Sequence, residues 1–203
     1  MNNIKTNLEH VHKRILNAAQ HSGRDPKEIK LLLATKTVSY ENICVALQLG
    51  ETIIGENKTQ ELKEKYEGLT SIAHTTHFIG HLQTNKIKDV LKYADCIQSI
   101  DRLELVQKLD RRLQQEGRTM DIMLQVNTSN EESKFGLDPA ASIDFAKEVS
   151  TFNTLKVKGL MTIGLFSSEL EKVRKCYRLL KDIQSERYSM QLANSDLNET
   201  SMW

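Results

Sequence analysis

The chain has 203 residues, of which 39% are hydrophobic and 27% are charged, with 28 basic and 27 acidic side chains. This length predicts a single domain (1–203) with room for a sizeable core. The even balance of charge gives no reason to expect nucleic acid or an anionic membrane as a partner. No uncharged run approaches the roughly 20 residues that span a bilayer, and residues 1–20 are too charged for the apolar core of a signal peptide.

The cysteines and histidines give no support for a metal centre. Cys44, Cys96 and Cys176 lie far apart and are odd in number, which speaks against disulfides and structural zinc and favours a reduced compartment. Residues 74–81 contain an H-x2-H-x3-H pattern, but residues three apart on an extended strand face opposite sides, so structural or rim histidines are expected. The sequence therefore predicts a cytoplasmic protein without a metal. It leaves open whether the protein is a monomer or a homodimer.

Hydrophobic periodicity predicts a leading helix followed by six strand–helix units. Apolar residues at positions 4, 8, 11 and 15 line one face of a helix within residues 1–22. Short apolar runs predict the strands, and the segments between them have helical periodicity. The expected strands are 31–34, 51–54, 77–79, 96–100, 122–126 and 157–163. The expected helices that follow them are 41–49, 58–66, 85–93, 101–113, 138–149 and 168–183.

Acidic and hydroxyl residues stand where the later helices are expected to begin. Asp101 with Glu104, and Ser168 with Glu171, have the spacing of capping boxes. Asp138 is the expected cap of a helix with a proline in its first turn. The inner face expected for the last helix consists of Leu170, Val173, Leu180 and Ile183.

The alternation of strands and helices predicts an α/β fold with a parallel sheet. An open doubly wound sheet and a (β/α)8 barrel both fit this order, but no strand is followed by the G-x-G-x-x-G of a dinucleotide site. A barrel has eight strands in about 250 residues. Six strands are clear here, with residues 188–192 as a possible stub of a seventh. The expected fold is a TIM-type barrel that is incomplete, with strands seven and eight degraded or missing.

Lys36 is the first candidate for chemistry. It directly follows the apolar run LLLAT, at the point where an expected strand, buried on both faces, ends and a loop begins. The carboxyl ends of barrel strands are where catalytic residues collect. Partial desolvation at such a place lowers the pKa of a lysine and frees an amine for Schiff-base chemistry. The alternative is an ordinary surface lysine after a strand, which position alone favours.

Three further loops follow expected strands and carry small and polar residues. Gly55, Glu56 and Asn57 follow the second strand, residues 80–86 the third, and residues 127–134 the fifth. All of them are expected at the same mouth as the lysine loop, although ordinary turn chemistry explains each one separately. No Ser/His/Asp constellation, P-loop or paired-carboxylate signature is visible in the sequence.

Taken together, these loops resemble one family, the YggS/PROSC pyridoxal phosphate homeostasis proteins. The resemblance covers residues 1–185 and follows the order and spacing of that family. The matching strings are ATKTV around Lys36, IGENKTQEL from residue 54, HFIGHLQTNKIK from residue 77, SIDRL from residue 99, LQVNTSNEESKFGL from residue 124 and KGLMTIG from residue 158.

The resemblance implies a fold like the N-terminal barrel domain of alanine racemase. It also implies pyridoxal 5'-phosphate held as an internal aldimine, on Lys36 at the matching position, with Asn57 as a pocket residue. The family has no settled reaction and is thought to carry or buffer the cofactor. The implied function is therefore cofactor homeostasis without catalysis.

The tail, residues 186–203, departs from the family pattern. Residues 188–196 look like a degraded copy of a family strand that reads LSMGMS-x-D, in which Ser195 takes the role of the family serine if two residues are inserted. The following VRIGT-x-IFG segment is absent. The loops after strands seven and eight build the phosphate site of such barrels, so an incomplete phosphate site and weak cofactor binding are expected.

Two alternatives to cofactor homeostasis remain open from the sequence. One is a truncated relic that binds the cofactor weakly or not at all. The other is an amino-acid racemase that uses the same aldimine. Racemisation needs a second acid/base on the opposite face of the cofactor, which the related racemases bring from an added β-domain, so the racemase is the less favoured of the two.

Overall fold

The structure is a computed structural model that describes residues 2–188 and 195–203. Its contacts divide the chain into two compact units, Met1–His77 and Phe78–Trp203. The single domain expected from the chain length stays a prediction. In the described residues every strand from the first to the sixth is followed by a helix, which confirms the six predicted strand–helix units.

The first unit begins with the predicted leading helix, α1 (Asn2–His21). The apolar residues of its predicted inner face are half-buried, and Ala19 at the end of that face is buried. A turn capped by Asp25, whose side chain accepts from the amide of Lys27, follows the helix. The other elements are η1 (Pro26–Glu28), β1 (Leu33–Ala34), α2 (Tyr40–Gln48), β2 (Ile53–Glu56), α3 (Thr59–Leu69) and β3 (Thr75–Phe78), whose last residue opens the second unit.

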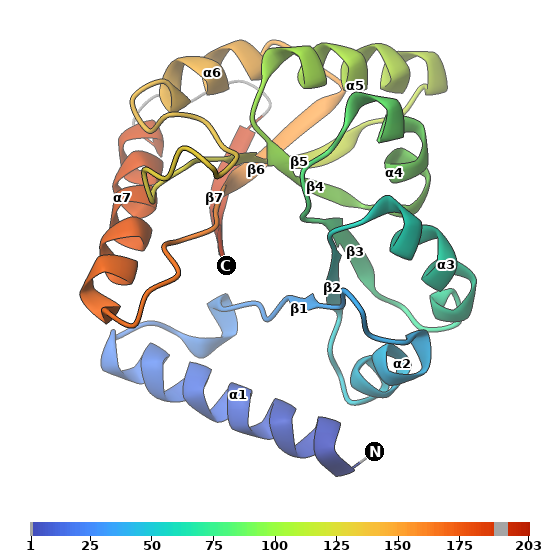
Figure 1. Cartoon of the computed structure of the whole chain (residues 1–203), viewed down its shortest axis with the longest axis vertical. Helices are drawn as coiled ribbons and strands as arrows, with labels where there is room; N and C mark the ends of the chain where they lie inside the picture. Colours follow the sequence, from blue (N-terminus) through green and yellow to red (C-terminus); the bar gives the residue numbers. More distant parts are fainter. Residues whose placement is uncertain (1, 189–194) are drawn as a thin grey trace. The chain divides into compact units, whose positions relative to one another are not determined.

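Strand β1 is shorter and more exposed than predicted. Only Leu33 and Ala34 form the strand, which pairs in parallel with β2 through Leu33 to Ile54 and Ala34 to Gly55. Leu33 is half-buried and Ala34 is exposed, so the expected strand buried on both faces is wrong. The physical reason is that β1 pairs on one side only within this unit. Helices α2 and α3 lie against β2, as Figure 1 shows, and bury Ile54 between them.

The second unit is a parallel sheet covered by helices. Strands β4 to β7 are neighbours in chain order, and the helices that follow β4, β5 and β6 lie along the outer face of this sheet (Figure 1). The elements are η2 (Thr84–Lys86), α4 (Ile87–Tyr93), β4 (Cys96–Ile100), α5 (Leu103–Glu116), β5 (Met120–Gln125), α6 (Ser142–Val149), β6 (Leu155–Thr162), α7 (Leu170–Tyr188) and β7 (Ser195–Met202).

Helix α5 has the buried face that was predicted from the sequence but not the predicted N-terminal capping box. Val106, Leu109 and Leu113 are 0% exposed, as their helical spacing predicts. The predicted capping box is wrong, because Asp101 accepts a bond from the guanidinium of its neighbour Arg102 at 2.7 Å and Arg102 is the N-cap, without a side-chain cap bond. The carboxylate of Asp101 is thus engaged by the guanidinium of Arg102 and not by the first turn of the helix.

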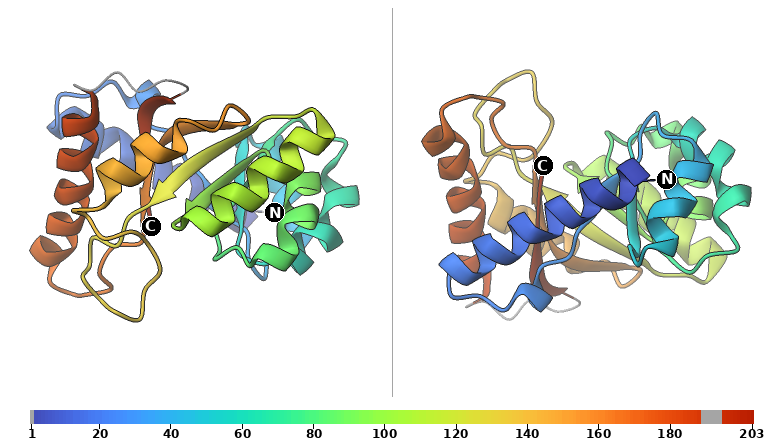
Figure 2. Two further views of the ribbon diagram at one scale, coloured as in Figure 1. Left: turned by 90° about the horizontal axis from the view of Figure 1, so that it is seen from above. Right: turned by 90° about the horizontal axis from the view of Figure 1, so that it is seen from below.

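The loop between β5 and α6 is longer than predicted. The helix begins at Ser142, not at Asp138, whose carboxylate instead accepts from the amide of Ala140 at 2.7 Å and stabilises a turn ahead of the helix. Figure 2 shows the loop at residues 126–141 projecting beyond the carboxyl end of β5 in both views. This loop carries the NTSNEESKFG string of the sequence analysis.

A seventh strand, β7, lies in the tail that departs from the family pattern. Of the possible strand stub at residues 188–192, Tyr188 belongs to α7 and residues 189–192 lie outside the described residues. Strand β7 instead pairs with β6, and the backbone amide of Trp203 donates to Thr162 at 3.1 Å just beyond it. The indole of Trp203 packs against buried Cys96, Met123 and Met161. The segment SDLNETSM has no apolar run, which explains why periodicity missed it.

Gly159 is required for the contact between β6 and β7. It faces Glu199 across the pair, and a Cβ at this position would collide with the carbonyl oxygen of Glu199. We expect Gly159→Ala to lower the free energy of unfolding by about 1–3 kcal/mol, since overpacking forces backbone shifts. Urea unfolding measures this, with Lys156→Ala on the exposed side of the same strand as the control. Equal stability of the two variants would contradict the close approach.

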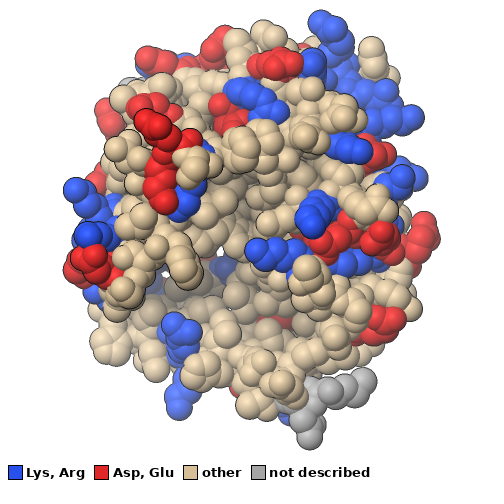
Figure 3. Space-filling view, viewed as in Figure 1, with Lys and Arg blue, Asp and Glu red and all other residues tan. Residues whose placement is uncertain are grey.

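The charged side chains are mixed on the surface. Figure 3 shows groups of acidic and basic side chains scattered over a visible face that is mostly uncharged. Among the described helices, none is long and apolar enough to cross a membrane.

Candidate functional site

Lys36 lies in a tight turn just beyond β1. The amide of Val38 donates to the carbonyl of Thr35 at 3.0 Å and closes the turn, while Thr37 has a left-handed backbone with φ of 63°. Lys36 is exposed, so the partial desolvation expected from the sequence is not found. Within the described residues its amine has neither a hydrogen-bond nor an ion-pair partner. The structure thus presents an unengaged amine at a strand end.

A second lysine lies behind this turn and is fully engaged. Lys65, on α3, is only 9% exposed. Its ammonium donates to Glu56 at 2.6 Å, to Glu61 at 2.8 Å and to the carbonyl of Thr35 at 2.8 Å. We call Glu56, Glu61 and Lys65 the carboxylate–lysine cluster. All three ammonium hydrogens have acceptors, so this buried cation is compensated.

The carboxylate–lysine cluster shifts the titration of two of its members. Burial by itself would lower the pKa of Lys65, but the hydrogen bonds and charges of Glu56 and Glu61 outweigh burial and raise that pKa. Hydrogen bonds from Lys65 and from the backbone amide of Thr37 lower the pKa of Glu61. Both residues therefore stay charged across the physiological range. Glu61 and Lys65 were not among the site residues predicted from the sequence, although their spacing of four on a predicted helix is that of an ion pair.

Acid should weaken the contribution of Glu61 to stability. A lowered pKa means that the ionised carboxylate stabilises the fold fully above its ordinary pKa of 4.5, and loses this as pH falls through the folded-state pKa. We expect the stability difference between the parent and Glu61→Gln, measured by urea unfolding, to be constant near about pH 6–7 and to shrink below 4.5. Glu64→Gln, an exposed site on the same helix, is the control. A difference that persists unchanged at about pH 3 would refute this.

Asn57 follows β2 as Lys36 follows β1. Ala34 and Gly55 are paired, and Lys36 and Asn57 each lie two residues beyond this pair, so both extend from neighbouring strand ends. Asn57 is half-buried, and within the described residues its amide oxygen is buried without a hydrogen-bond partner. The second carboxylate oxygen of Glu56 is likewise unpartnered there. Unsatisfied buried acceptors are uncommon and fit an incoming donor group.

The three histidines do not assemble a metal site. In the described residues no group of three or more His, Cys, Asp or Glu side chains is placed to hold a metal ion. The ring of His81 stacks on Phe135, with centroids 3.7 Å apart, and its Nδ1 lies 3.8 Å from Asp101. Burial and the positive charge of Arg102 lower the pKa of His81. Among the described residues this Nδ1 is buried without a hydrogen-bond partner, so the stacking on Phe135 and the nearby Asp101 carboxylate are the contacts that position the ring.

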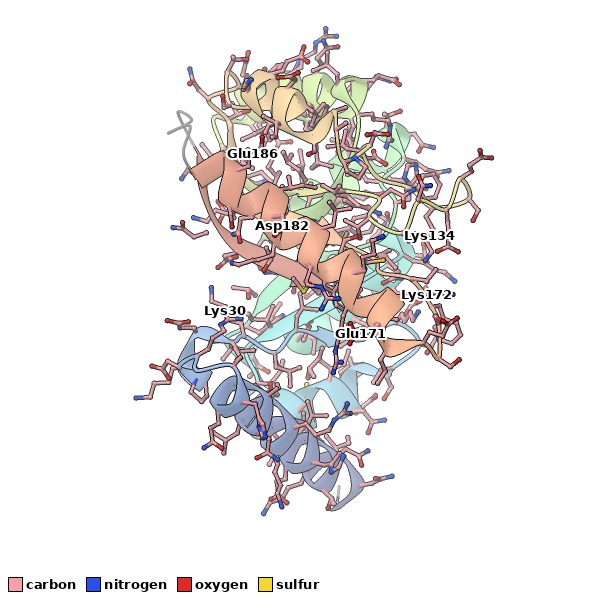
Figure 4. The ribbon with its side chains drawn as sticks, turned by 90° about the vertical axis from the view of Figure 1, so that its left-hand side faces the viewer. Lys30, Lys134, Glu171, Lys172, Asp182 and Glu186 are labelled. Carbon is pink, nitrogen blue, oxygen red and sulfur yellow. The ribbon has the colours of Figure 1, made fainter. Side chains whose placement is uncertain are left out.

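The loop after β5 is held by its own contacts. The side-chain amide nitrogen of Asn127 donates to the backbone carbonyls of Glu131 and Lys134, at 2.9 and 3.3 Å. Lys134 donates to the carbonyl of Gly164 at 2.9 Å, which ties this loop to the segment before α7. Figure 4 shows Lys134 beside the end of α7 that carries Glu171. These polar residues hold the loop itself together, which is the ordinary turn chemistry expected for such residues.

Ser195, the third predicted cofactor residue, is the first residue of β7 and pairs with Val157. Its side chain lies outside the described part of the structure, so its role stays a prediction.

Comparison with known proteins defines the class of this chain. The profile of the family described as "Alanine racemase, N-terminal domain" matches residues 6–196. A solved alanine racemase from Clostridium difficile superposes on 100% of this chain and 49% of the racemase with a TM-score of 0.79 at 15% identity, a likeness of fold alone. The fold is therefore an incomplete TIM-type barrel, to which the described residues contribute seven strands.

Proteins with higher sequence identity show which family within this fold the chain resembles. A pyridoxal phosphate homeostasis protein of Aquifex aeolicus is 35% identical over 179 residues, 88% of this chain and 78% of the relative. A crystal structure from Bifidobacterium adolescentis has a TM-score of 0.93 at 34% identity over 98% of this chain and 85% of that one. PipY of Synechococcus elongatus, with pyridoxal phosphate bound, has a TM-score of 0.74 at 25% identity over 93% of this chain and 87% of the PipY chain. The chain belongs to the family of pyridoxal phosphate homeostasis proteins.

Proposed function

We propose that this chain binds pyridoxal 5'-phosphate covalently through Lys36 and serves cofactor homeostasis in the cytoplasm without catalysing a reaction. The observation that carries the assignment is the unengaged amine of Lys36 in a turn fixed by a buried cation. When bound, the cofactor supplies an aldehyde that condenses with a primary amine, with loss of water. The free amide oxygen of Asn57 would accept a hydrogen bond from a hydroxyl of the bound group.

Amino-acid racemisation is the alternative function, and the chain around Lys36 does not favour it. General acid–base catalysis needs a group that can gain and lose a proton near the reacting atom. The neighbouring carboxylates of Glu56 and Glu61 are both bound to Lys65, and Lys65 itself has three acceptors. The names of the relatives, homeostasis proteins, support the same choice.

The test is spectroscopic and uses the full chain. Pyridoxal 5'-phosphate is added, the visible absorbance is recorded, the adduct is reduced with borohydride, and the label is located by peptide mass spectrometry. We expect a visible band that disappears on reduction, with the label on Lys36. Conversion of either alanine enantiomer into the other is measured in parallel and is expected to equal the buffer blank. A label elsewhere overturns the site, and turnover of alanine overturns the non-catalytic assignment.

A further inference from the structure

We propose that Lys65 is a positioning residue for Lys36, acting through Glu56 and Glu61 to fix the turn that presents the reactive amine. This inference rests on the proposed function, because it concerns how Lys36 is made ready for an aldehyde. In that reaction the nitrogen of Lys36 adds to the aldehyde carbon, the C=O bond is replaced by C=N, and one water leaves. Lys65 takes no part in these bonds.

The cluster holds the backbone on both sides of Lys36. On the preceding side, the ammonium of Lys65 donates to the carbonyl of Thr35 at 2.8 Å. On the following side, the amide of Thr37 donates to the same oxygen of Glu61 that binds Lys65, at 2.7 Å. One buried cation therefore fixes both peptide groups that flank Lys36, one directly and one through a carboxylate.

Glu56 anchors the cation to the sheet. Its carboxylate, 1% exposed, accepts from Lys65 and also from the hydroxyl of Thr35 at 2.6 Å. That hydroxyl lies 3.1 Å from the carbonyl of Gly55 as well, on the strand next to β1. The cluster thus links the turn to the end of β2, from which Asn57 extends.

The conformation of the turn explains why such an anchor is needed. Thr37 is β-branched and has a φ of 63°, a left-handed conformation that such residues rarely adopt. A single short-range bond from its own hydroxyl to the carbonyl of Lys36, at 2.6 Å, accompanies this backbone. Residues in unfavourable backbone conformations persist where the surroundings over-determine them, and they gather at functional sites. The bond from the Thr37 amide to Glu61 supplies that constraint.

The cluster also separates the roles of two nearby lysines. Lys65 has all three hydrogens bound and a raised pKa, so it keeps its proton and has no lone pair for attack. Lys36 has no such partner within the described residues. The arrangement therefore directs an aldehyde to Lys36 and keeps Lys65 as a structural cation.

The experiment compares labelling of Lys36 across variants of the full chain. Pyridoxal 5'-phosphate and borohydride are used as the probe, the rate of labelling at Lys36 is read by peptide mass spectrometry between about pH 6 and 10, and circular dichroism checks the fold. The variants are Glu61→Gln, Lys65→Met and Lys65→Arg. The matched controls on the same helix are Glu64→Gln and Lys63→Met, both at exposed positions.

We expect labelling at Lys36 to fall at least about tenfold in Lys65→Met and in Glu61→Gln, and to stay within about threefold of the parent in Lys65→Arg and in both controls. Recovery of the rate in Lys65→Arg, where a cation can again bind the carboxylates, distinguishes positioning by the charged group from packing of the side-chain stem, which Lys65→Met retains. If Lys65→Met does not fold, the labelling rates in Glu61→Gln and Lys65→Arg still test the positioning role of Lys65.

Two results separate this inference from the proposed function. Labelling of the parent at a residue other than Lys36 overturns the proposed function and this inference with it. Labelling of the parent at Lys36, together with labelling rates in Glu61→Gln and Lys65→Met that match the controls, overturns the positioning role and leaves the proposed function intact.

Discussion

Lys36→Ala is expected to remove the visible band that pyridoxal 5'-phosphate acquires on binding to the parent, together with the borohydride-trapped label at position 36. The reason is chemical, since alanine has no amine to form the carbon–nitrogen linkage, and Lys65 cannot replace it while its three donors are bound. Because Lys36 is exposed, the free energy of unfolding should change by less than about 0.5 kcal/mol. Difference spectra and urea unfolding measure the two effects.

Lys63→Ala is the matched control for this experiment, as an exposed lysine of the same unit. It should keep the absorbance and the label of the parent. Retention of the same band in Lys36→Ala would show that another lysine, or no lysine, is responsible.

Leu180→Ala is expected to lower the free energy of unfolding by about 2–5 kcal/mol, whereas Leu170→Ala should change it by less than about 0.5 kcal/mol. Both leucines lie on α7, and the helical period of the sequence assigns both to its inner face. In the structure Leu180 is 0% exposed and Leu170 is 65% exposed. The first substitution leaves a cavity in the core of the second unit, and the second removes surface that already faces water.

Urea unfolding of the two variants, at equal protein concentration, measures this pair. Both variants are Leu→Ala changes on one helix, and alanine is the better helix former, so a large loss of stability in Leu180→Ala reports burial. Comparable losses in the two variants would mean that Leu170 is covered in solution, as the sequence pattern predicts, and the exposed start of α7 would be wrong.

The two leucines also illustrate what a sequence can predict. Periodicity identifies elements in the middle of the chain well, because the buried faces of β4 and α5 follow from the spacing of their own residues. It fails at element ends, as Leu170 and Asp101 show, since there local side-chain bonds compete with the pattern. Strand β7 was missed for a different reason, because its alternation is polar and its identity depends on pairing with β6.

The candidate site divides in the same way. Lys36 and Asn57 were predicted because each follows an expected strand and because each lies in a motif that matches the family. Both signals are local in the sequence. The partners of Lys65 at Thr35 and Glu56 lie 30 and 9 residues away in the chain, and only folding brings them together. No local pattern specifies such a long-range bond, so the carboxylate–lysine cluster became visible only in the structure.

Trp203 is the single tryptophan of the chain, and its indole packs between Cys96, Met123 and Met161 with a bond to Gln98 at 3.4 Å. This placement makes the intrinsic fluorescence of the protein a local signal from the second unit. The absorbance of a group on Lys36 belongs to the first unit. Tryptophan fluorescence and adduct absorbance therefore report on the second and the first unit, respectively, in the same sample. Unfolding followed with both signals shows whether the two units unfold in one cooperative transition or one after the other.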